Sequence, residues 1–243
     1  MHGKPQANMG IAREGVPFIV PPMFIGGALI VIAYASGSNV WLVPAFLFLA
    51  FAIFSRAFFR DPVRIPPESD TAIVAPGDGT VKIVREIADA RFPGGLATQV
   101  SIFLSVANVH VNRVPCTGKI IGFSYSPGKF LLAWEEKAST ENEQTEIVIQ
   151  NTHGIVVVKQ IAGFVARRII CDLQIGEWVG IGERLGLIRF GSRMDLRFPT
   201  TLACAVKVGD TVVGAETLIA DFAPDGSAPS SAEIESSAAE MLS

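Results

Sequence analysis

The distribution of charged residues divides the chain into two parts. No Asp, Glu, Lys or Arg occurs between Glu14 and Arg56, and this stretch contains two apolar runs, over residues 16–35 and 40–54. The turn-type sequence Ser36-Gly37-Ser38-Asn39 separates them. A membrane-spanning helix needs about 20 apolar residues, a length that the second run reaches if it continues to residue 59. The pattern predicts a membrane-embedded helical hairpin over residues 16–60, either spanning the bilayer or lying in one leaflet.

A signal peptide and a buried core hairpin are the alternatives to a membrane hairpin. A signal peptide has one short apolar core and a small-residue cleavage site, whereas this stretch has two runs. Positive charges lie on both sides of the stretch and none lies in its turn; they are Lys4, Arg13, Arg56, Arg60 and Arg64. The positive-inside rule therefore predicts that both ends of the hairpin, and the domain after it, lie on the cytoplasmic side of the cell membrane.

From residue 71 onward the pattern is typical of β-structure. Short segments rich in β-branched residues alternate with turn residues; they cover 72–74, 80–84, 99–104, 118–125, 146–150 and 154–160. Residues 161–170 are compatible with a helix or a strand. The predicted organisation is a flexible N-terminus (1–15), the membrane hairpin (16–60), a β-rich catalytic domain (61–222) and a disordered tail rich in Ser, Ala and Glu (223–243).

A weak internal repeat has an offset of 33 residues. Ile175-Gly176-Glu177-Trp178-Val179 matches Val208-Gly209-Asp210-Thr211-Val212. A glycine followed by an acid between apolar residues is typical of a turn, in which glycine adopts a positive φ and the acid caps the turn. The pattern resembles the barrel-sandwich, or hammerhead, β-fold of biotinyl and lipoyl carriers, so the predicted fold is mainly β.

Composition excludes some classes of function. A formal net charge of −3 does not favour binding of nucleic acid through bulk charge. The three cysteines, Cys116, Cys171 and Cys204, have no metal-binding spacing, and we expect them to be reduced and to act as small buried apolar residues.

Four motifs occur in one order along the chain: Phe58-Phe59-Arg60-Asp61-Pro62, Ala75-Pro76-Gly77-Asp78-Gly79, Asn108-Val109-His110-Val111-Asn112-Arg113-Val114-Pro115, and Phe190-Gly191-Ser192-Arg193-Met194-Asp195. Each one alone is weak, but the set resembles the short, archaeal-type form of phosphatidylserine decarboxylase over residues 56–220. The resemblance implies that Ser192 attacks the carbonyl of Gly191 and that the chain is cut between them. A β chain (1–191) and an α chain (192–243) that begins with a pyruvoyl group would result.

The resemblance also implies the reaction. The pyruvoyl carbonyl forms a Schiff base with the amine of phosphatidylserine in the membrane and accepts the electron pair left by CO₂, which gives phosphatidylethanolamine. No metal and no pyridoxal phosphate is expected. The cut chains would form a heterodimer, and a homo-oligomer is left open.

The same resemblance assigns roles to single residues, each of which also has a plainer interpretation. His110 is the predicted acid or base, although a lone histidine between valines is more often a half-buried structural residue. Asp78 is predicted to assist self-cleavage, although Gly-Asp-Gly is commonly a turn. Arg113 and Arg193 are candidate binders of the substrate phosphate or carboxylate, although a solvated surface arginine is the ordinary expectation for either one.

The sequence departs from the longer members of the family at one important place. These carry a second histidine as the base for self-cleavage, and Arg113 occupies that position here. The Asp-His-Ser triad is therefore not intact, and either His110 serves both steps or another group, such as His153, takes over one of them.

Three other functions remain open from the sequence. One is a pyruvoyl decarboxylase for another amino-acid-headed lipid or for a soluble amino acid. Another is a non-catalytic scaffold with a biotinyl-like domain, although the chain lacks the lysine-bearing hairpin tip of such carriers. The third is a membrane-anchored structural protein that remains one intact chain.

Overall fold

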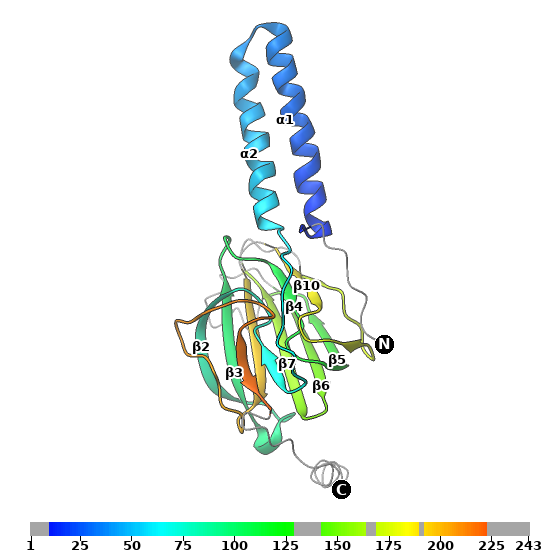
Figure 1. The fold of residues 1–243 in the computed structure, drawn as a ribbon, viewed down its shortest axis with the longest axis vertical. Coiled ribbons are helices and arrows are strands. Elements are labelled where there is room, and N and C mark those ends of the chain that lie inside the picture. Colours follow the sequence, from blue (N-terminus) through cyan, green and yellow to red (C-terminus); the bar gives the residue numbers. More distant parts are fainter. Residues whose placement is uncertain (1–9, 129–141, 164–168, 190–191, 223–243) are drawn as a thin grey trace.

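The computed structural model describes residues 10–128, 142–163, 169–189 and 192–222. A helical hairpin projects from one end of a mainly β domain (Figure 1). The mainly β prediction is thereby confirmed, together with the pair of apolar N-terminal helices. The predicted disordered tail, most of the predicted flexible N-terminus, and Gly191 lie outside the described residues.

The two helices of the hairpin are α1 (Val16–Ser36) and α2 (Leu42–Phe58). Gly37 ends α1 with a φ of +65°, a left-handed conformation that favours glycine at a helix C-terminus. The helices approach closely at Gly26, where a Cβ atom would lie 2.7 Å from Leu49 Cγ. Each helix is long and apolar enough to cross a membrane, within the spans Arg13–Ser36 and Asn39–Phe58.

Most apolar side chains of the hairpin have no protein around them. Phe24, Phe46 and Ile53 are each about 70% exposed in the isolated chain. A helix in the core of a soluble protein would bury such residues, so these faces are suited to contact with lipid.

Thirteen strands are present in the described part of the chain. They are β1 (Ala72–Val74), β2 (Gly79–Ala88), β3 (Leu96–Leu104), β4 (Val111–Arg113), β5 (Gly118–Ser126), β6 (Gln144–Asn151), β7 (Gly154–Ala162), β8 (Ile169–Cys171), β9 (Trp178–Val179), β10 (Arg184–Ile188), β11 (Ser192–Pro199), β12 (Thr211–Val212) and β13 (Leu218–Asp221). Short 3₁₀ turns lie at Arg13–Gly15, Asn39–Trp41 and Pro93–Gly95.

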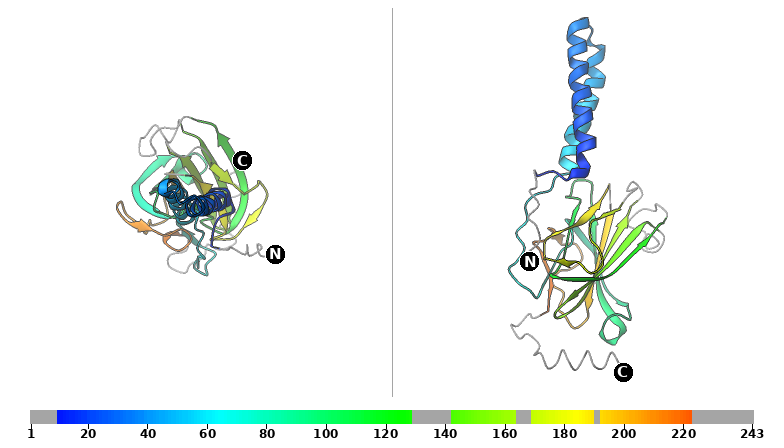
Figure 2. Two further views of the ribbon diagram at one scale, coloured as in Figure 1. Left: turned by 90° about the horizontal axis from the view of Figure 1, so that it is seen from above. Right: turned by 90° about the vertical axis from the view of Figure 1, so that its right-hand side faces the viewer.

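The largest sheet has eight antiparallel strands in the order β12-β2-β3-β11-β7-β6-β5-β9. It curls into an open half-barrel, as the end-on and side views of Figure 2 show. A three-stranded sheet (β4-β10-β8) and the pair β1-β13 complete the domain. The core between them is aliphatic and includes Cys116, which is fully buried as predicted; Cys171 and Cys204 are partly buried against the same core.

The six predicted strand segments are all present. The apolar run over residues 196–208 predicts one strand, which is wrong: β11 begins earlier, at Ser192, and ends at Pro199, where the next residues turn. The region 161–170, compatible with a helix or a strand, is strand at its described residues in β7 and β8, apart from residue 163.

The internal repeat corresponds to a repeated turn. Gly176 and Gly209 have φ values of +89° and +101°, as the sequence predicted. Glu177 and Asp210 each accept a hydrogen bond from the backbone N–H three residues earlier, at 3.0 and 2.9 Å. The two turns lead into β9 and β12, which are the two edge strands of the large sheet. The repeat therefore places the same turn before each edge strand.

A small apolar cluster and several polar contacts join the hairpin to the domain. Ala12, Phe58, Phe59, Val109, Val111 and Leu187 are buried together in this cluster. Ile11 pairs with Arg60 in a β-bridge. Arg184 of β10 forms an ion pair with Glu14, at 2.9 Å. The hairpin is therefore packed onto the domain and not merely tethered to it.

Candidate functional site

Ser192 is the first residue of β11, in the middle of the large sheet. It lies directly opposite Leu104 of β3 on one side and Ala162 of β7 on the other. Only 2% of its surface is exposed, and its hydroxyl has no hydrogen-bond partner among the described residues. A buried hydroxyl without a partner is costly, which makes this position a candidate for chemistry.

The surroundings of Ser192 follow from strand geometry. Residues two apart on a strand share a face, as do residues directly opposite on paired strands, so Ser192, Met194, Leu104 and Gln160 share one face. Gly77 covers this face, since a Cβ atom there would lie 3.1 Å from Met194 Sδ and 3.6 Å from Leu104 Cδ2. The Gly77-Asp78 loop is thereby placed over the serine side of the sheet.

A chain of hydrogen-bonded, buried polar side chains continues from this face. Thr145 Oγ1 donates to Gln160 Oε1 at 2.7 Å, and Gln160 Nε2 donates to Asn112 Oδ1 at 2.8 Å. Asn112 Nδ2 is left without a partner among the described residues, although Asn112 is fully buried. Asn112 Nδ2 lies 3.5 Å from the position that a Cβ atom of Gly77 would occupy, so this amide donor faces the Gly77-Asp78 loop.

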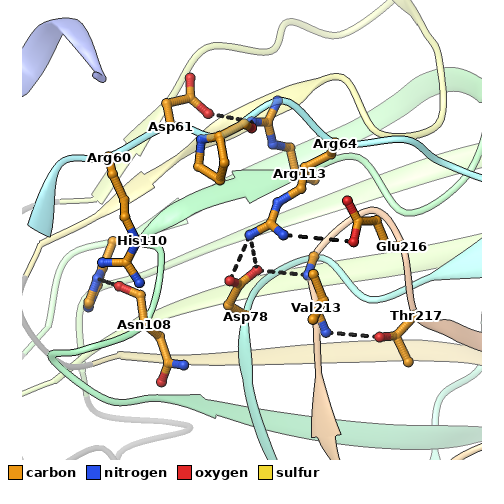
Figure 3. Close-up of polar contacts among 12 residues, drawn as sticks. Arg60, Asp61, Arg64, Asp78, Asn108, His110, Arg113, Val213, Glu216 and Thr217 are labelled. Atoms are coloured by element: carbon orange, nitrogen blue, oxygen red, sulfur yellow. Dashed lines mark hydrogen bonds and ion pairs between the residues drawn. The ribbon is translucent and has the colours of Figure 1, made fainter. Parts of the chain in front are cut away.

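Asp78 is held by two donors (Figure 3). Arg64 Nη2 donates to both carboxylate oxygens, at 2.9 and 2.7 Å, and the Gly214 backbone N–H donates to Oδ1 at 2.8 Å. Arg64 Nη1 also lies 3.9 Å from Glu216 Oε2. Asp78 is thus a fixed, charge-paired carboxylate at the rim of the site.

His110 immediately precedes β4 and is fully buried. Its Nδ1 is 2.9 Å from the Asn108 carbonyl, which fixes the proton on Nδ1 and leaves a lone pair on Nε2. Nε2 has no partner among the described residues. Burial lowers the pKa of His110 to about 4, the Asn108 carbonyl opposes the shift, and the charge of Arg60 adds to it. His110 is therefore a neutral imidazole with a free proton acceptor at neutral pH.

These contacts do not form an Asp-His pair. Among the described residues, Asp78 bonds to Arg64 and to a backbone N–H, while His110 bonds to a backbone carbonyl (Figure 3). His153 lies in the β6-β7 hairpin turn, at the end of β7 opposite to Ala162. At about 3.3 Å per residue, the nine positions between Ala162 and His153 place His153 roughly 30 Å along the sheet from Ser192.

The two candidate arginines are both paired with carboxylates. Arg113 donates to Asp61, in a buried ion pair, and to the Pro62 carbonyl at 3.1 Å. Arg193 is 1% exposed and donates to both oxygens of Asp195, at 2.6 and 3.0 Å. A substrate anion at either arginine would have to share it with, or displace, that carboxylate.

Comparison with known proteins identifies the family. The phosphatidylserine decarboxylase family model matches residues 51–220, which is more than half of the chain. This chain belongs to the phosphatidylserine decarboxylase family.

Curated relatives of the family agree over most of the chain. A protein of Geotalea uraniireducens is 41% identical over 213 residues, which cover 87% of this chain and 96% of the relative. One of Geobacter metallireducens is 42% identical over 219 residues, with 88% and 97% covered. One of Chlorobium chlorochromatii is 46% identical over 188 residues, with 76% and 86% covered. All three carry the name phosphatidylserine decarboxylase proenzyme.

The sequence assigned no role to several residues that contact the candidates. The structure adds Asn112 and Gln160 on the Ser192 side, and Arg64 and Asp61 beside the other candidates. Asp61 and Asn112 lie inside the quoted motifs, which was the available signal for them. Arg64 gave no such signal, because a charge near the end of an apolar helix is ordinary.

Proposed function

We propose that this enzyme decarboxylates phosphatidylserine to phosphatidylethanolamine after it cuts its own chain and converts Ser192 into a pyruvoyl group. The observation that carries the proposal is the buried hydroxyl of Ser192, which has no partner among the residues that the structure describes, in a chain of this family. The proenzyme name of the relatives supports processing into two chains.

The first step would be self-cleavage. The Ser192 oxygen attacks the carbonyl carbon of the preceding residue; the new C–O bond replaces the C–N bond, and the proton of the hydroxyl ends on the freed amine. A base then removes the α-proton of residue 192 while the bond between Cβ and the ester oxygen breaks, which leaves a carboxylate on the β chain and dehydroalanine at position 192. Addition of water releases ammonia and leaves the pyruvoyl group.

His110 is the residue that we assign to proton transfer. Its hydrogen bond to the Asn108 carbonyl fixes the tautomer in which Nε2 accepts a proton. Asp78 is our candidate to assist self-cleavage, as a fixed anion in the loop over the serine face.

The pyruvoyl group supplies the electron sink for the electron pair that remains on the substrate carbon when CO₂ leaves. The protein must then hold the head group and return a proton to that carbon. We assign this proton transfer to His110, whose Nε2 would first accept a proton from the substrate ammonium group and then return it to the carbon. We assign the anionic part of the head group to Arg113, with Arg193 as a second candidate. The free N–H of Asn112 is suited to a hydrogen bond with a neutral or anionic oxygen bound over the serine face.

The two cut chains are expected to stay together. The α chain would supply β11, which is hydrogen-bonded on both sides to β3 and β7 of the β chain. It would also supply β12 and β13, which pair with β2 and β1. These ladders hold the heterodimer without the peptide bond.

The hairpin supports action at a membrane. Its apolar side chains are exposed, both of its ends lie against the β domain, and the β3-β4 loop that carries Asn108 contacts its base (Figure 1). A lipid head group at a bilayer surface would thus meet the site end of the domain. The charge distribution around the hairpin favours the cytoplasmic side of the cell membrane.

Intact mass spectrometry under denaturing conditions tests the first half of the proposal. We expect two fragments that meet before residue 192, the second lacking a free N-terminal amine. Ser192→Ala should stay full length, whereas the control Ser126→Ala, at an exposed strand end, should be cut normally.

Substrate tests address the second half. Phosphatidylcholine vesicles that contain phosphatidylserine should yield CO₂ and phosphatidylethanolamine, whereas free serine should not react. Turnover of free serine alone would point to a soluble substrate. An uncut wild-type chain that releases no CO₂ from either substrate would overturn the proposal.

A further inference from the structure

The seven residues that follow the body of helix α2 run directly along the candidate site. We call residues 58–64 the exit segment. Phe58, Phe59 and Asp61 within it are each at most 2% exposed, so the first part of the segment is packed into the protein, whereas Val63 is 83% exposed. Its side chains contact candidate site residues one after another.

Phe58 contacts His110. The two rings have centroids 4.0 Å apart and are tilted by 31°. Because Phe58 is the last residue of α2, the end of the apolar hairpin forms one wall of the histidine's surroundings. The ring excludes water from the imidazole and limits its orientation.

Arg60 fixes the loop that orients the same histidine. Its guanidinium donates to the Ala57 carbonyl at the end of α2 and to the Ala107 carbonyl, both at 2.7 Å. Ala107 precedes Asn108, whose own carbonyl holds His110 Nδ1. Arg60 therefore bridges the hairpin and the loop that sets the tautomer of His110. Figure 3 shows the contact between Asn108 and His110.

The rest of the exit segment contacts two further site residues. Asp61 forms the buried ion pair with Arg113. Arg64 binds both oxygens of Asp78. Figure 3 shows these contacts side by side along the segment.

We propose that the exit segment is a positioning element of the active site, with Phe58 acting through His110 and Arg64 acting through Asp78. The base of the hairpin then positions residues of the site, and the hairpin also attaches the protein to the bilayer. The inference rests on the proposed function, since it concerns how fast the proposed steps run.

The proposal separates positioning from membrane attachment. If the hairpin served only for attachment, changes in the exit segment would leave turnover of a micelle-dispersed, short-chain phosphatidylserine unaffected. If the segment positions the site, changes in it lower kcat on that substrate, because a small displacement of a reacting group lowers the reaction rate strongly.

Phe58→Leu is the first test, because it keeps an apolar side chain and removes the ring face. We expect a roughly 10–100-fold loss of kcat on the short-chain substrate with little change in KM. The matched control is Phe46→Leu, the same change on an exposed face of the same helix, and it should behave as wild type.

A pH profile gives a second reading of the same variant. The charge of Arg60 lowers the pKa of His110, and on the side of the hairpin the imidazole packs against the apolar ring of Phe58. Loss of that ring admits water, so the pKa of His110 should rise toward its ordinary value. The acid limb of kcat should then move to higher pH, which a loss of fold alone would not produce.

Arg64→Gln tests the other contact through self-cleavage, which needs no substrate. We expect slower conversion of the precursor to two chains, measured by mass spectrometry during expression, and partial recovery in Arg64→Lys. Both proteins should be checked for an unchanged thermal unfolding transition.

The outcomes separate this inference from the proposed function. Wild-type kcat and pH profile in Phe58→Leu, together with wild-type cleavage in Arg64→Gln, overturn the inference while Ser192→Ala still supports the function. If the wild-type chain turns over no phosphatidylserine, the function fails, and the cleavage rates of the Arg64 variants still decide the positioning role.

Discussion

Gln160 Nε2 donates a hydrogen bond to Asn112 Oδ1 at 2.8 Å, between two fully buried side chains on different sheets. Gln160 lies on β7 of the large sheet, whereas Asn112 lies on β4 of the three-stranded sheet. Because Gln160 also accepts from Thr145, its amide orientation is defined, and this in turn directs the Asn112 amide nitrogen away from Gln160. One contact between sheets thus sets which atom of Asn112 faces the site.

Gln160→Leu is expected to be strongly destabilising. It removes the acceptor of Thr145 and the donor to Asn112, and each buried group left unpaired costs about 1–3 kcal/mol. We expect the free energy of unfolding to fall by about 2–4 kcal/mol in urea titrations of the detergent-solubilised protein. Gln150→Leu, on an exposed position of β6, is the control and should change the value by less than about 0.5 kcal/mol. Equal effects of the two changes would contradict the assigned network.

The Arg193–Asp195 pair should behave as a buried structural ion pair. Arg193→Met leaves the Asp195 carboxylate uncompensated, which typically costs about 3–5 kcal/mol, whereas Arg193→Met with Asp195→Leu should recover most of that loss. Chemical denaturation of the single and double variants measures this. A raised KM for phosphatidylserine at unchanged stability would instead support Arg193 as the binder of the substrate anion.

Acidification should destabilise the fold through His110. Its pKa is about 4 in the folded protein and 6.5 as an ordinary value, so between these pH values the unfolded chain binds the proton more readily. The contribution to stability is complete above about pH 6.5 and is lost as the pH falls toward 4, with a total on the order of 3 kcal/mol. The test compares unfolding at several pH values for the wild type and His110→Gln. The variant should lose less stability between pH 7 and 4.5, and identical slopes would contradict the assignment.

Cys116 should resist alkylation in the folded protein. It is fully buried, and burial raises the pKa of its thiol to about 12, so that very little thiolate forms at neutral pH. Iodoacetamide treatment followed by peptide mass spectrometry should label Cys116 only after unfolding in urea. Rapid labelling of the native protein at this position would show that the core around Cys116 opens easily.

Much of the fold could be predicted from local patterns. The two apolar runs predicted α1 and α2, since a stretch of such length without charge has few other stable structures. The glycine-acid pairs of the repeat predicted two turns, and both have the expected positive φ and acid cap. These features depend on the preferences of a few neighbouring residues, which the sequence contains directly.

The candidate site was predictable only in part. The motifs identified Ser192, His110 and Asp78 as candidates, but their partners are distant in sequence. The contacts of Arg64 with Asp78, and of Phe58 with His110, join residues 14 and 52 positions apart. No local pattern indicates which of the chain's 20 basic residues will meet a given carboxylate.

The sequence by itself determined the class of the protein, its apolar hairpin and the serine at which the chain is proposed to be cut, because each follows from adjacent residues. The tertiary structure alone decided that Phe58 at the base of the hairpin packs against His110, that Asp78 pairs with an arginine and not with a histidine among the described residues, and that Arg193 is enclosed. The physical reason is that burial and pairing are set by which strands become neighbours, and in this protein the curled sheet brings β11 and β7 together with the loops around β2 and β4 at the end of the domain nearest the hairpin.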